Sequence, residues 1–347
     1  MRLIVKLCAL INLFFFLALQ AKADELKIFT WEDYFSESVI EDFESKYGHT
    51  VSLIFFESEM LRDAVVYSGK AAAYDLIIMD GLTLGELGEA GSLADMSHVI
   101  TKGSQTFTKN ANKACTKFGV PYAHGTMGIG YRTSVVASPI STWMDVFVYA
   151  LENPQTVVLP GDDFDTIAIA LMALGYHPMS ENESELKQAY QLLLEVKDKL
   201  LVLRTSIGYA LDKKDKSEME VAVMYSGETE LIGEVTEQDD WAYTIPDEGT
   251  LLWHECLTTH INKPISNAAK EFLNHINETD NAVRNAEEIW FASSNITALG
   301  SASDEYLQDE ELFPVNLTDA NSYEYKSLGR GAENLRSQIL SVIQNRK

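Results

Sequence analysis

The sequence predicts an α/β protein made of two lobes, and three observations lead to this prediction. Short apolar runs alternate with helically periodic segments, first up to about residue 118 and again from about residue 156. The segment 74–79 (YDLIIM) ends in a continuous apolar run, which is typical of a buried strand in a parallel sheet. Between the two series, residues 119–131 are glycine-rich and β-like, which favours a crossing from one lobe to the other. Repeated strand–helix–strand units indicate sheets with helices on both faces.

In the first series, most predicted elements have a start or stop signal. An apolar run leads into a helix that Ser36 can cap and that stops at Gly48. A β-rich segment follows, then a helix that ends before Gly69, and the buried strand ends at Asp80-Gly81. The expected strands are 26–29, 50–56 and 74–79, and the expected helices are 36–48, 59–67 and a short one near 84–87.

The second series repeats the alternation after the glycine-rich segment. The glycines of that segment read G-x-x-G-x-G, which is not the dinucleotide-binding order and does not open a helix, so no cofactor is predicted. A long strand then returns across the molecule, and an amphipathic helix closes the chain. The expected strands are 156–159, 220–225, 241–245 and 251–261, and the expected helices are 166–174, 183–200 and 332–343.

The chain is strongly acidic, with 52 acidic and 27 basic residues and a formal net charge of −25 at pH 7. Such a charge repels the phosphate backbone of nucleic acids and the surface of anionic membranes. We therefore predict no nucleic-acid partner. A cationic ligand is compatible with this charge, but many exported proteins are acidic, so charge alone does not identify one.

The first 23 residues have the pattern of a targeting segment. Arg2 and Lys6 provide a positive start, an apolar run follows at 7–19, and residues 21–23 (AKA) form a small-x-small cleavage site. The apolar run is shorter than the roughly 18 residues that a membrane-spanning helix needs. We therefore predict a soluble, exported protein cleaved after Ala23.

One stretch with the chemistry of a cation site is Trp31-Glu32-Asp33-Tyr34, where a predicted strand gives way to a helix. Aromatic faces attract ammonium groups, and carboxylates pair with them. Open α/β sheets bind ligands at the carboxyl ends of their strands, which is where this stretch lies. The alternative is an ordinary loop with an acidic first helical turn, which favours the helix dipole.

Two further places combine carboxylates or aromatic rings in a similar way. Asp162, Asp163 and Asp165 lie at the start of a predicted helix, and Asp162 and Asp165 can lie on one side of its first turn. N-capping explains one of these aspartates, but three in four positions exceed what a cap requires. A Ca²⁺ loop is the less natural alternative, because the EF-hand spacing, its glycine and its terminal glutamate are missing. In the returning strand, Trp253 and Glu255 share one face.

Catalytic motifs are lacking in the sequence, which contains no G-x-S-x-G elbow, phosphate-binding loop or H-E-x-x-H zinc motif. His254, Cys256 and His260 would share one face of a strand, as in a metal site, although no fourth ligand is evident. An exported metal-dependent enzyme that uses these residues with 162–165 is therefore an alternative. Cys115 and Cys256 could instead form one disulfide, but their spacing does not decide this.

The chain resembles the periplasmic polyamine-binding proteins, the spermidine/putrescine receptors of bacterial ABC importers, over nearly its whole mature length. The resemblance implies the type II two-lobe periplasmic binding fold, with each lobe a mixed sheet flanked by helices and the ligand in a cleft between the lobes. It implies a first lobe of residues 24–130 plus about 255–298 and a second of about 135–250 plus 302–347. The stretches that carry it are 28–34 (IFTWEDY), 74–76 (YDL), 121–122 (PY), 128–131 (GIGY), 141–143 (STW), 162–165 (DDFD), 174–176 (LGY), 224–227 (MYSG) and 246–249 (PDEG) followed by Trp253.

The ligand residues of that family carry over to matching positions. The resemblance implies that aromatic rings flank the amine chain and that Asp162 and Asp165 hold a terminal ammonium. Two departures are Asp80, an extra carboxylate in a loop that usually contains serine or threonine, and His124, where tryptophan is usual. These departures leave the preferred amine open and allow norspermidine. The ligand residues that the resemblance implies are Trp31, Asp33, Tyr34, Asp80, His124, Asp162, Asp165, Tyr225, Trp253, Glu255 and Phe291.

The function implied by the resemblance is binding without chemical reaction. The protein would be a monomer that binds a spermidine, norspermidine or putrescine-like amine and delivers it to an inner-membrane ABC permease. The alternative within the same family is a sensor that signals amine occupancy to a membrane cyclic-di-GMP enzyme with GGDEF or EAL domains and so controls biofilm formation. An iron- or sugar-binding relative is disfavoured because the implied site is acidic on both lobes.

Overall fold

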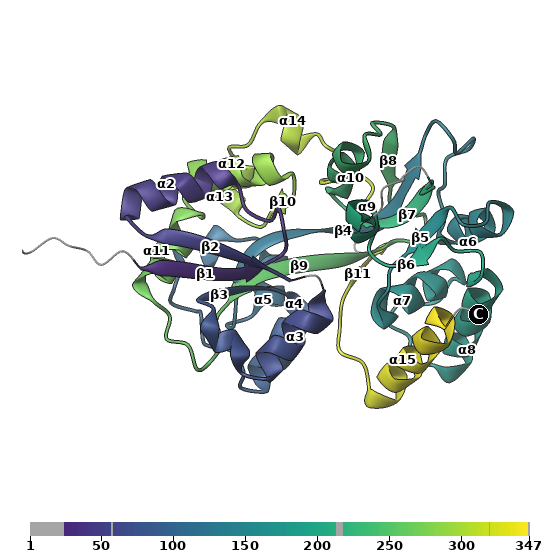
Figure 1. Cartoon of the computed structure of the whole chain (residues 1–347), viewed down its shortest axis with the longest axis horizontal. Coiled ribbons are helices and arrows are strands. Elements are labelled where there is room, and N and C mark those ends of the chain that lie inside the picture. The colour runs from purple at the N-terminus through teal and green to yellow at the C-terminus, as the bar shows by residue number, and fades with distance from the viewer. Residues whose placement is uncertain (1–23, 57, 213–217, 319, 346–347) are drawn as a thin grey trace, which may run out of the picture.

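The structure is a computed structural model that describes residues 24–56, 58–212, 218–318 and 320–345 (Figure 1). The leader predicted at residues 1–23 lies outside the described residues. Strands and helices form two groups, and two long strands, β4 (Val120–Arg132) and β9 (Thr250–Thr258), run between them (Figure 1). The predicted α/β fold with two lobes, each a mixed sheet flanked by helices, is confirmed. No helix in the described part of the chain is both long and apolar enough to cross a membrane.

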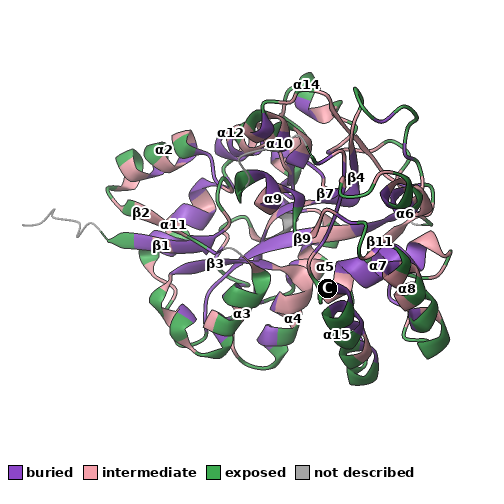
Figure 2. Ribbon diagram, turned by 45° about the vertical axis from the view of Figure 1, so that its right-hand side comes forward, coloured by how far each residue is buried: buried purple, intermediate pink, exposed green. Residues whose placement is uncertain are grey.

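The first group is centred on β1 (Glu25–Thr30), which pairs in parallel with β2 (Thr50–Phe55) and β3 (Leu76–Asp80). β9 pairs antiparallel with β3, and β4 pairs antiparallel with β9. Most residues of β1, β3 and β9 are buried, and the surrounding helices expose their outer faces (Figure 2). The helices of this group are α2 (Glu37–Tyr47), α3 (Glu59–Tyr67), α4 (Gly81–Glu89), α5 (Lys109–Cys115) and α11 (Asn267–His275), with 3-10 turns η1 (Lys70–Ala73) and η2 (Gly103–Thr106).

The second group begins where β4 leaves β9 and pairs antiparallel with β7 (Val221–Tyr225) and β8 (Trp241–Thr244). β5 (Val157–Leu159) and β6 (Val202–Leu203) extend this sheet in parallel beyond β7. Helix α7 (Asp163–Ala173) is buried from residue 165 to residue 172, so it lies in the middle of this core. The other helices are α6 (Trp143–Glu152), α8 (Glu183–Val196), α9 (Ser206–Asp212), α10 (Glu228–Thr236) and α15 (Arg330–Gln344).

A smaller apolar cluster is centred on Tyr306 and Leu312. In the sequence it falls between α11 of the first group and α15 of the second. Its short strand β10 (Ala292–Ser293) pairs with β4, and the later strand β11 (Ser322–Glu324) pairs with β9. Both short strands therefore attach to the two long strands that join the groups. The helices here are α12 (Thr279–Ile289), α13 (Ile296–Leu299) and α14 (Asp304–Leu307).

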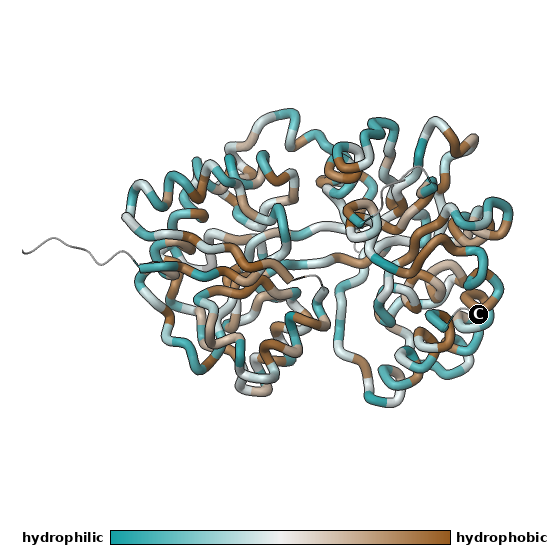
Figure 3. Tube along the Cα trace, in the orientation of Figure 1, coloured by the Kyte–Doolittle hydropathy of each residue, from teal (hydrophilic) through white to brown (hydrophobic). Residues whose placement is uncertain are grey.

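Most predicted strands and helices are present and differ from the observed elements by a few residues at their ends. Ser36 caps α2 as expected, and Gly48 ends it with a φ of 74°. Apolar residues follow the strands through the interior of each group (Figure 3). The sequence reasoning missed α5, α6, α9, α10 and α11–α14, together with the short strands β6, β10 and β11. For α11 a signal was present, because the Ser266 side chain accepts a hydrogen bond from the Ala269 N–H, as an N-cap does.

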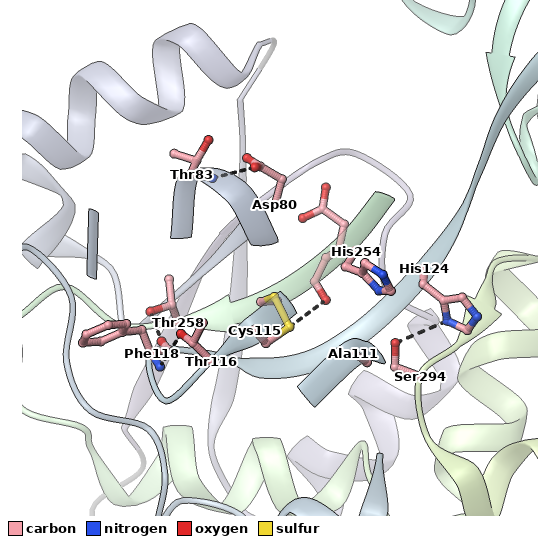
Figure 4. The surroundings of a disulfide bond; sticks show 12 residues. Asp80, Thr83, Ala111, Cys115, Thr116, Phe118, His124, His254, Thr258 and Ser294 are labelled. Carbon is pink, nitrogen blue, oxygen red and sulfur yellow. Dashed lines mark hydrogen bonds between the residues drawn. A yellow bond between two sulfur atoms is a disulfide. The ribbon is translucent and has the colours of Figure 1, made fainter. Parts of the chain in front are cut away.

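Cys115 at the end of α5 forms a disulfide with Cys256 of β9, which settles the pairing that the spacing left open (Figure 4). The bond joins residues 141 positions apart in the sequence, so it restricts the unfolded chain strongly. Replacing both residues (Cys115→Ala with Cys256→Ala) is expected to lower the free energy of unfolding by about 2–4 kcal/mol. Urea denaturation measures this, and an unchanged midpoint would contradict it.

Candidate ligand-binding site

Three predicted site residues meet where β1, β3 and β9 lie side by side. Trp31 directly follows β1, and Asp80 is the last residue of β3. Glu255 of β9 lies directly opposite Asp80 across the antiparallel pair. Side chains of directly opposed residues lie on the same face of a sheet, about 5 Å apart at Cβ. Two carboxylates and an indole therefore lie together at this edge of the sheet, which is formed by the carboxyl ends of β1 and β3 and the neighbouring part of β9.

Glu255 is the most unusual of these residues, because its carboxylate is buried without full compensation. It is 7% exposed, and its Oε2 atom has no hydrogen-bond partner among the described residues. Burial raises the pKa of Glu255 well above its usual value, and repulsion from Asp80 and Glu59 raises it further. Arg62 and a hydrogen bond from the Trp31 side chain oppose this increase in pKa. A buried carboxylate in this state is stabilised by an incoming cation.

Arg62 of α3 is a site residue that the sequence reasoning missed. Its side chain is 0% exposed, and its Nη2 atom lies 2.7 Å from Asp80 Oδ2. Its Nε atom lies 2.9 Å from Asp63 Oδ1, and its Nη1 atom lies 3.7 Å from Glu59 Oε1. No sequence signal marks this arginine, because a charged residue on an amphipathic helix usually lies on the solvent face.

Asp80 has internal partners as well as a place in the predicted site. Besides the contact with Arg62, its Oδ1 atom accepts a hydrogen bond of 2.8 Å from Thr83 N–H and so caps α4 (Figure 4). Glu59 keeps 52% of its side-chain surface exposed, yet surrounding protein and the nearby Asp80 raise its pKa to about 8. Within the described part of the chain, Glu255 therefore has an oxygen without a hydrogen-bond partner, Glu59 forms only a long ion pair with Arg62, and Asp80 is hydrogen-bonded to both Arg62 and Thr83.

The predicted aromatic residues form two groups around Glu255. The Trp31 ring packs edge-on against Phe56, with ring centroids 4.4 Å apart. The Phe291 ring lies between the other two predicted rings, 5.1 Å from Tyr34 and 5.9 Å from Trp253 between centroids. All of these predicted rings are partly exposed, so ring surface remains available to a ligand.

Asp33 lies on an exposed turn between β1 and α2. Its φ is 56°, which places it in the left-handed region that aspartate tolerates better than most residues. The turn, rather than a contact with Glu255, therefore accounts for its position.

In the second group, Asp162 and Asp165 stand at the start of α7, as the sequence predicts. Asp162 caps the helix by accepting a hydrogen bond of 2.7 Å from the Asp165 N–H. The Asp165 carboxylate is 4% exposed and accepts hydrogen bonds from the hydroxyls of Tyr225 and Tyr325. Asp162 is exposed, yet the surrounding protein and repulsion from Asp165 raise its pKa to about 8, and burial raises the pKa of Asp165 to about 6.

The carboxylates of the first group of elements and those at the start of α7 raise each other's pKa values. Asp162 raises the pKa of Glu59, and Glu59 and Asp80 raise the pKa of Asp165. Repulsion of this kind falls off with distance and is screened by water, so the two sets of carboxylates must lie near each other. A cation placed between them would relieve the repulsion on both sides.

Glu228, at the start of α10, is a further buried acid that the sequence reasoning missed. It accepts hydrogen bonds from the Ser206 hydroxyl at 2.7 Å and from Tyr225 N–H at 3.2 Å. Burial raises its pKa to about 7 despite these bonds. Tyr325 was missed for a different reason, since it lies 160 residues from the aspartate that it contacts.

Gly125 of β4 shows how closely the chain packs beside Trp253, which lies opposite it in β9. A Cβ atom on Gly125 would lie 2.5 Å from the Trp253 ring and 2.1 Å from Ser226 Oγ. A side chain here would displace the indole, so a glycine is required at this close approach.

His124, which is predicted as a ligand residue, lies on a different face of the sheet from Trp253 and Glu255. Its ring stacks on His254 at 5.9 Å between centroids, and its Nδ1 atom lies 3.4 Å from Ser294 Oγ (Figure 4). A bulge between Pro121 and Ala123 shifts the pairing of β4 with β9 by one residue. This shift puts His124 opposite His254, on the face away from Trp253 and Glu255. Burial lowers the pKa of His124 to about 4.

The alternative metal site is also wrong as proposed, because the disulfide with Cys115 occupies the Cys256 sulfur. Of the two histidines, His260 accepts a hydrogen bond from Asn262 N–H through Nδ1 at 3.1 Å. His254 lies 3.3 Å from Glu324, whose own side chain is exposed. The described residues contain no group of three or more histidine, cysteine, aspartate or glutamate side chains placed to hold a metal ion.

A hollow elsewhere on the surface lies among α2, α11 and α12, away from all of these residues. Its charged groups already pair, since Lys46 lies 3.1 Å from Glu278. It therefore offers no unpaired charge to a ligand. The hollow is lined by Asp42, Ser45, Lys46, His275, Glu278 and Asn281.

The chain is similar to known solute-binding proteins. Residues 38–314 match the family model of bacterial extracellular solute-binding proteins. The norspermidine sensor of Vibrio cholerae serotype O1 is 26% identical over 324 residues, which cover 93% of this chain and 90% of that protein. Spermidine/putrescine-binding periplasmic protein 1 of Haemophilus influenzae is 22% identical over 303 residues, covering 86% of this chain and 82% of the relative.

Among solved structures, the fold is similar to that of the spermidine/putrescine ABC transporter substrate-binding protein PotD from Streptococcus pneumoniae. The TM-score is 0.77 at 20% identity, and the match covers 93% of this chain and 100% of that one. This likeness shows the two-lobe fold. Together with a family match that spans most of its length, it establishes that the chain belongs to the bacterial extracellular solute-binding proteins.

Proposed function

We propose that this protein binds a linear polyamine of the spermidine, norspermidine or putrescine class between its two lobes and catalyses no reaction. The observation that carries the proposal is the Glu255 carboxylate, which is 7% exposed with an Oε2 atom that has no partner among the described residues. An ammonium group would supply the missing partner. The similarity to polyamine-binding relatives supports the same ligand class.

The ligand residues in this proposal have separate roles. Glu255 and Glu59 pair with an ammonium at the first-lobe end, and Asp162 and Asp165 pair with one at the second-lobe end. The methylene segments between the amines lie against the aromatic rings. Each ammonium loses hydration on entry, so carboxylates at both ends are needed to offset that cost. The rings in this role are Trp31, Tyr34, Tyr225, Trp253 and Phe291.

The lobes in this proposal are residues 24–130 with about 255–298, and about 135–250 with 302–347. Two separate apolar cores support this division, one around Phe43 and Leu76 and one around Trp143 and Ile169. β4 and β9 contribute to both, which makes them the natural hinge. Closure about these strands would bring the two carboxylate groups onto one ligand.

The leader at residues 1–23 would direct the protein to the periplasm and be cleaved after Ala23. Relatives named as periplasmic binding proteins support this location. Amino-terminal sequencing of the protein purified from a periplasmic extract tests it, and a mature chain that begins at Asp24 is expected.

Two partners are compatible with amine binding, and we favour an inner-membrane ABC permease, with the binding protein acting as a monomer. The second is a membrane cyclic-di-GMP enzyme, to which the protein would signal as a sensor, and the similarity to the Vibrio cholerae norspermidine sensor supports a sensing role. Uptake of labelled amine by cells that express or lack the protein distinguishes the two. Loss of uptake indicates import, whereas unchanged uptake with altered cyclic-di-GMP indicates signalling.

Replacing Asp162 with asparagine is expected to weaken amine binding by about tenfold or more, because one carboxylate of the second-lobe end is lost. Asparagine still caps α7, so the fold is retained. Asp163→Asn is the matched control, since the Asp163 carboxylate accepts a hydrogen bond from Ser337 of α15. Isothermal titration that gave both variants the same affinity would contradict the role of Asp162.

Native mass spectrometry of the protein as purified tests the proposed ligand class. A retained amine would appear as an added mass that disappears after dialysis against denaturant and refolding. The refolded protein should regain the added mass with spermidine or norspermidine. Failure to bind any di-, tri- or tetra-amine would overturn the proposal.

A further inference from the structure

The Arg62 guanidinium lies where the first-lobe carboxylates converge. It is 2.7 Å from Asp80 and 3.7 Å from Glu59, and its side chain is 0% exposed. Its Nη1 atom has no hydrogen-bond partner among the described residues. A buried arginine among carboxylates is a fixed cation inside an acidic site.

The register of the sheet determines which carboxylate charges Arg62 can offset. Asp80 and Glu255 lie directly opposite each other in β3 and β9. Like charges in this position repel each other. Arg62 donates to Asp80 and so offsets one of the two charges, which leaves the other, on Glu255, for a ligand.

Arg62 also lies close to the aromatic rings of the site. Its guanidinium carbon lies 5.8 Å from the centroid of the Phe56 ring, and Phe56 packs against Trp31 at 4.4 Å. Trp31 in turn donates a hydrogen bond to Glu255. Phe56 and Trp31 therefore form a chain of contacts from Arg62 to Glu255, in addition to the direct contact of Arg62 with Asp80.

We infer that Arg62 takes the place of one ligand ammonium and so limits how many charged nitrogens the protein accepts at the first-lobe end. This inference rests on the proposed function. The native site then favours amines that present one ammonium at that end. Removing the guanidinium would leave the Asp80 carboxylate without its ion-pair partner and open a polar space beside it, which suits an amine that is one aminoalkyl unit longer.

The test is isothermal titration of putrescine, spermidine and spermine into the parent protein and into Arg62→Ala. The ratio of spermine affinity to spermidine affinity is expected to rise by about tenfold in the variant, which corresponds to about 1.4 kcal/mol. Arg62→Met combined with Asp80→Asn removes both charges, and its ratio is expected to return to within about threefold of the parent ratio. Arg284→Ala removes an exposed arginine that pairs with Asp42, and its ratio should equal that of the parent.

Each outcome bears on the inference. An unchanged ratio in folded Arg62→Ala overturns it, and so does an equal rise in the doubly substituted protein, because space rather than charge would then decide. If circular dichroism shows that Arg62→Ala is unfolded, the same titrations are made with Arg62→Gln. An unchanged ratio in that variant then overturns the inference. A parent protein that binds none of the amines defeats the proposed function itself, whereas amine binding with an unchanged ratio defeats only the role of Arg62.

Discussion

Glu255→Gln is expected to weaken amine binding by at least about 30-fold. Removing one member of a buried ion pair costs about 2–5 kcal/mol of binding free energy, and about 2 kcal/mol corresponds to that factor. Glutamine has nearly the same shape as glutamate, so the cavity and its rings are retained. Isothermal titration at pH 8 measures the loss.

The same substitution is expected to leave the ligand-free protein at least as stable as the parent. The Glu255 carboxylate is buried, and repulsion from Asp80 and Glu59 adds to the cost of its charge. Glutamine removes that charge, so the free energy of unfolding without ligand should stay equal or rise. A residue that only supported the fold would show the opposite result, lower stability with unchanged affinity.

Glu220→Gln is the matched control for this experiment. Its carboxylate accepts a hydrogen bond of 2.6 Å from the Tyr149 hydroxyl, at the end of β7 away from Tyr225. Amine affinity should therefore remain at the parent value. Equal loss of affinity in both variants would indicate that overall charge, and not Glu255, determines binding.

Amine binding is expected to tighten by at least about tenfold between pH 6 and pH 8. The raised pKa values, about 8 for Glu59 and Asp162 and about 6 for Asp165, mean that several of these acids carry protons in the ligand-free protein near neutral pH. An ammonium ligand favours their charged forms and so displaces protons. Each proton released changes the affinity by a factor of about ten per pH unit. The terminal ammonium groups of the amine keep their charge over this range.

Proton release and stability give two independent measurements of this linkage. Titrations in phosphate and in Tris at pH 7 should differ in apparent enthalpy, because the two buffers take up protons with different heats. The carboxyl pKa values are raised on folding, so their contribution to stability is full below about pH 4 and is lost as the pH rises toward 8. Ligand-free protein should therefore unfold more easily at pH 8 than at pH 6. Identical enthalpies in the two buffers, with affinity independent of pH, would contradict the account.

Local signals were sufficient to predict much of this molecule. The alternation of apolar runs and helical segments predicted both lobes, and Asp162 stands at the N-cap of α7 as its spacing suggested. The alternation within β9 placed Trp253 and Glu255 on one face. In each case the property depends on residues that are close together in the sequence, where periodicity and capping act.

The remaining features depend on contacts between distant segments. Arg62 is paired only because α3 packs beside the end of β3, and helical periodicity marks such an arginine as solvent-facing. The bulge after Pro121 reversed the face on which His124 lies, and nothing local in the sequence fixes the register of β4 against β9. Tyr325 reaches Asp165 from the segment that leads into α15.

The proposed ligand of this protein is a linear polyamine. Isothermal titration of norspermidine, spermidine and putrescine into the refolded, ligand-free protein at pH 8 tests it most directly. At least one of these amines is expected to bind saturably with a stoichiometry of one, and Glu255→Gln should abolish or strongly weaken this binding. Absence of binding to all three amines, or binding that Glu255→Gln leaves unchanged, would contradict it.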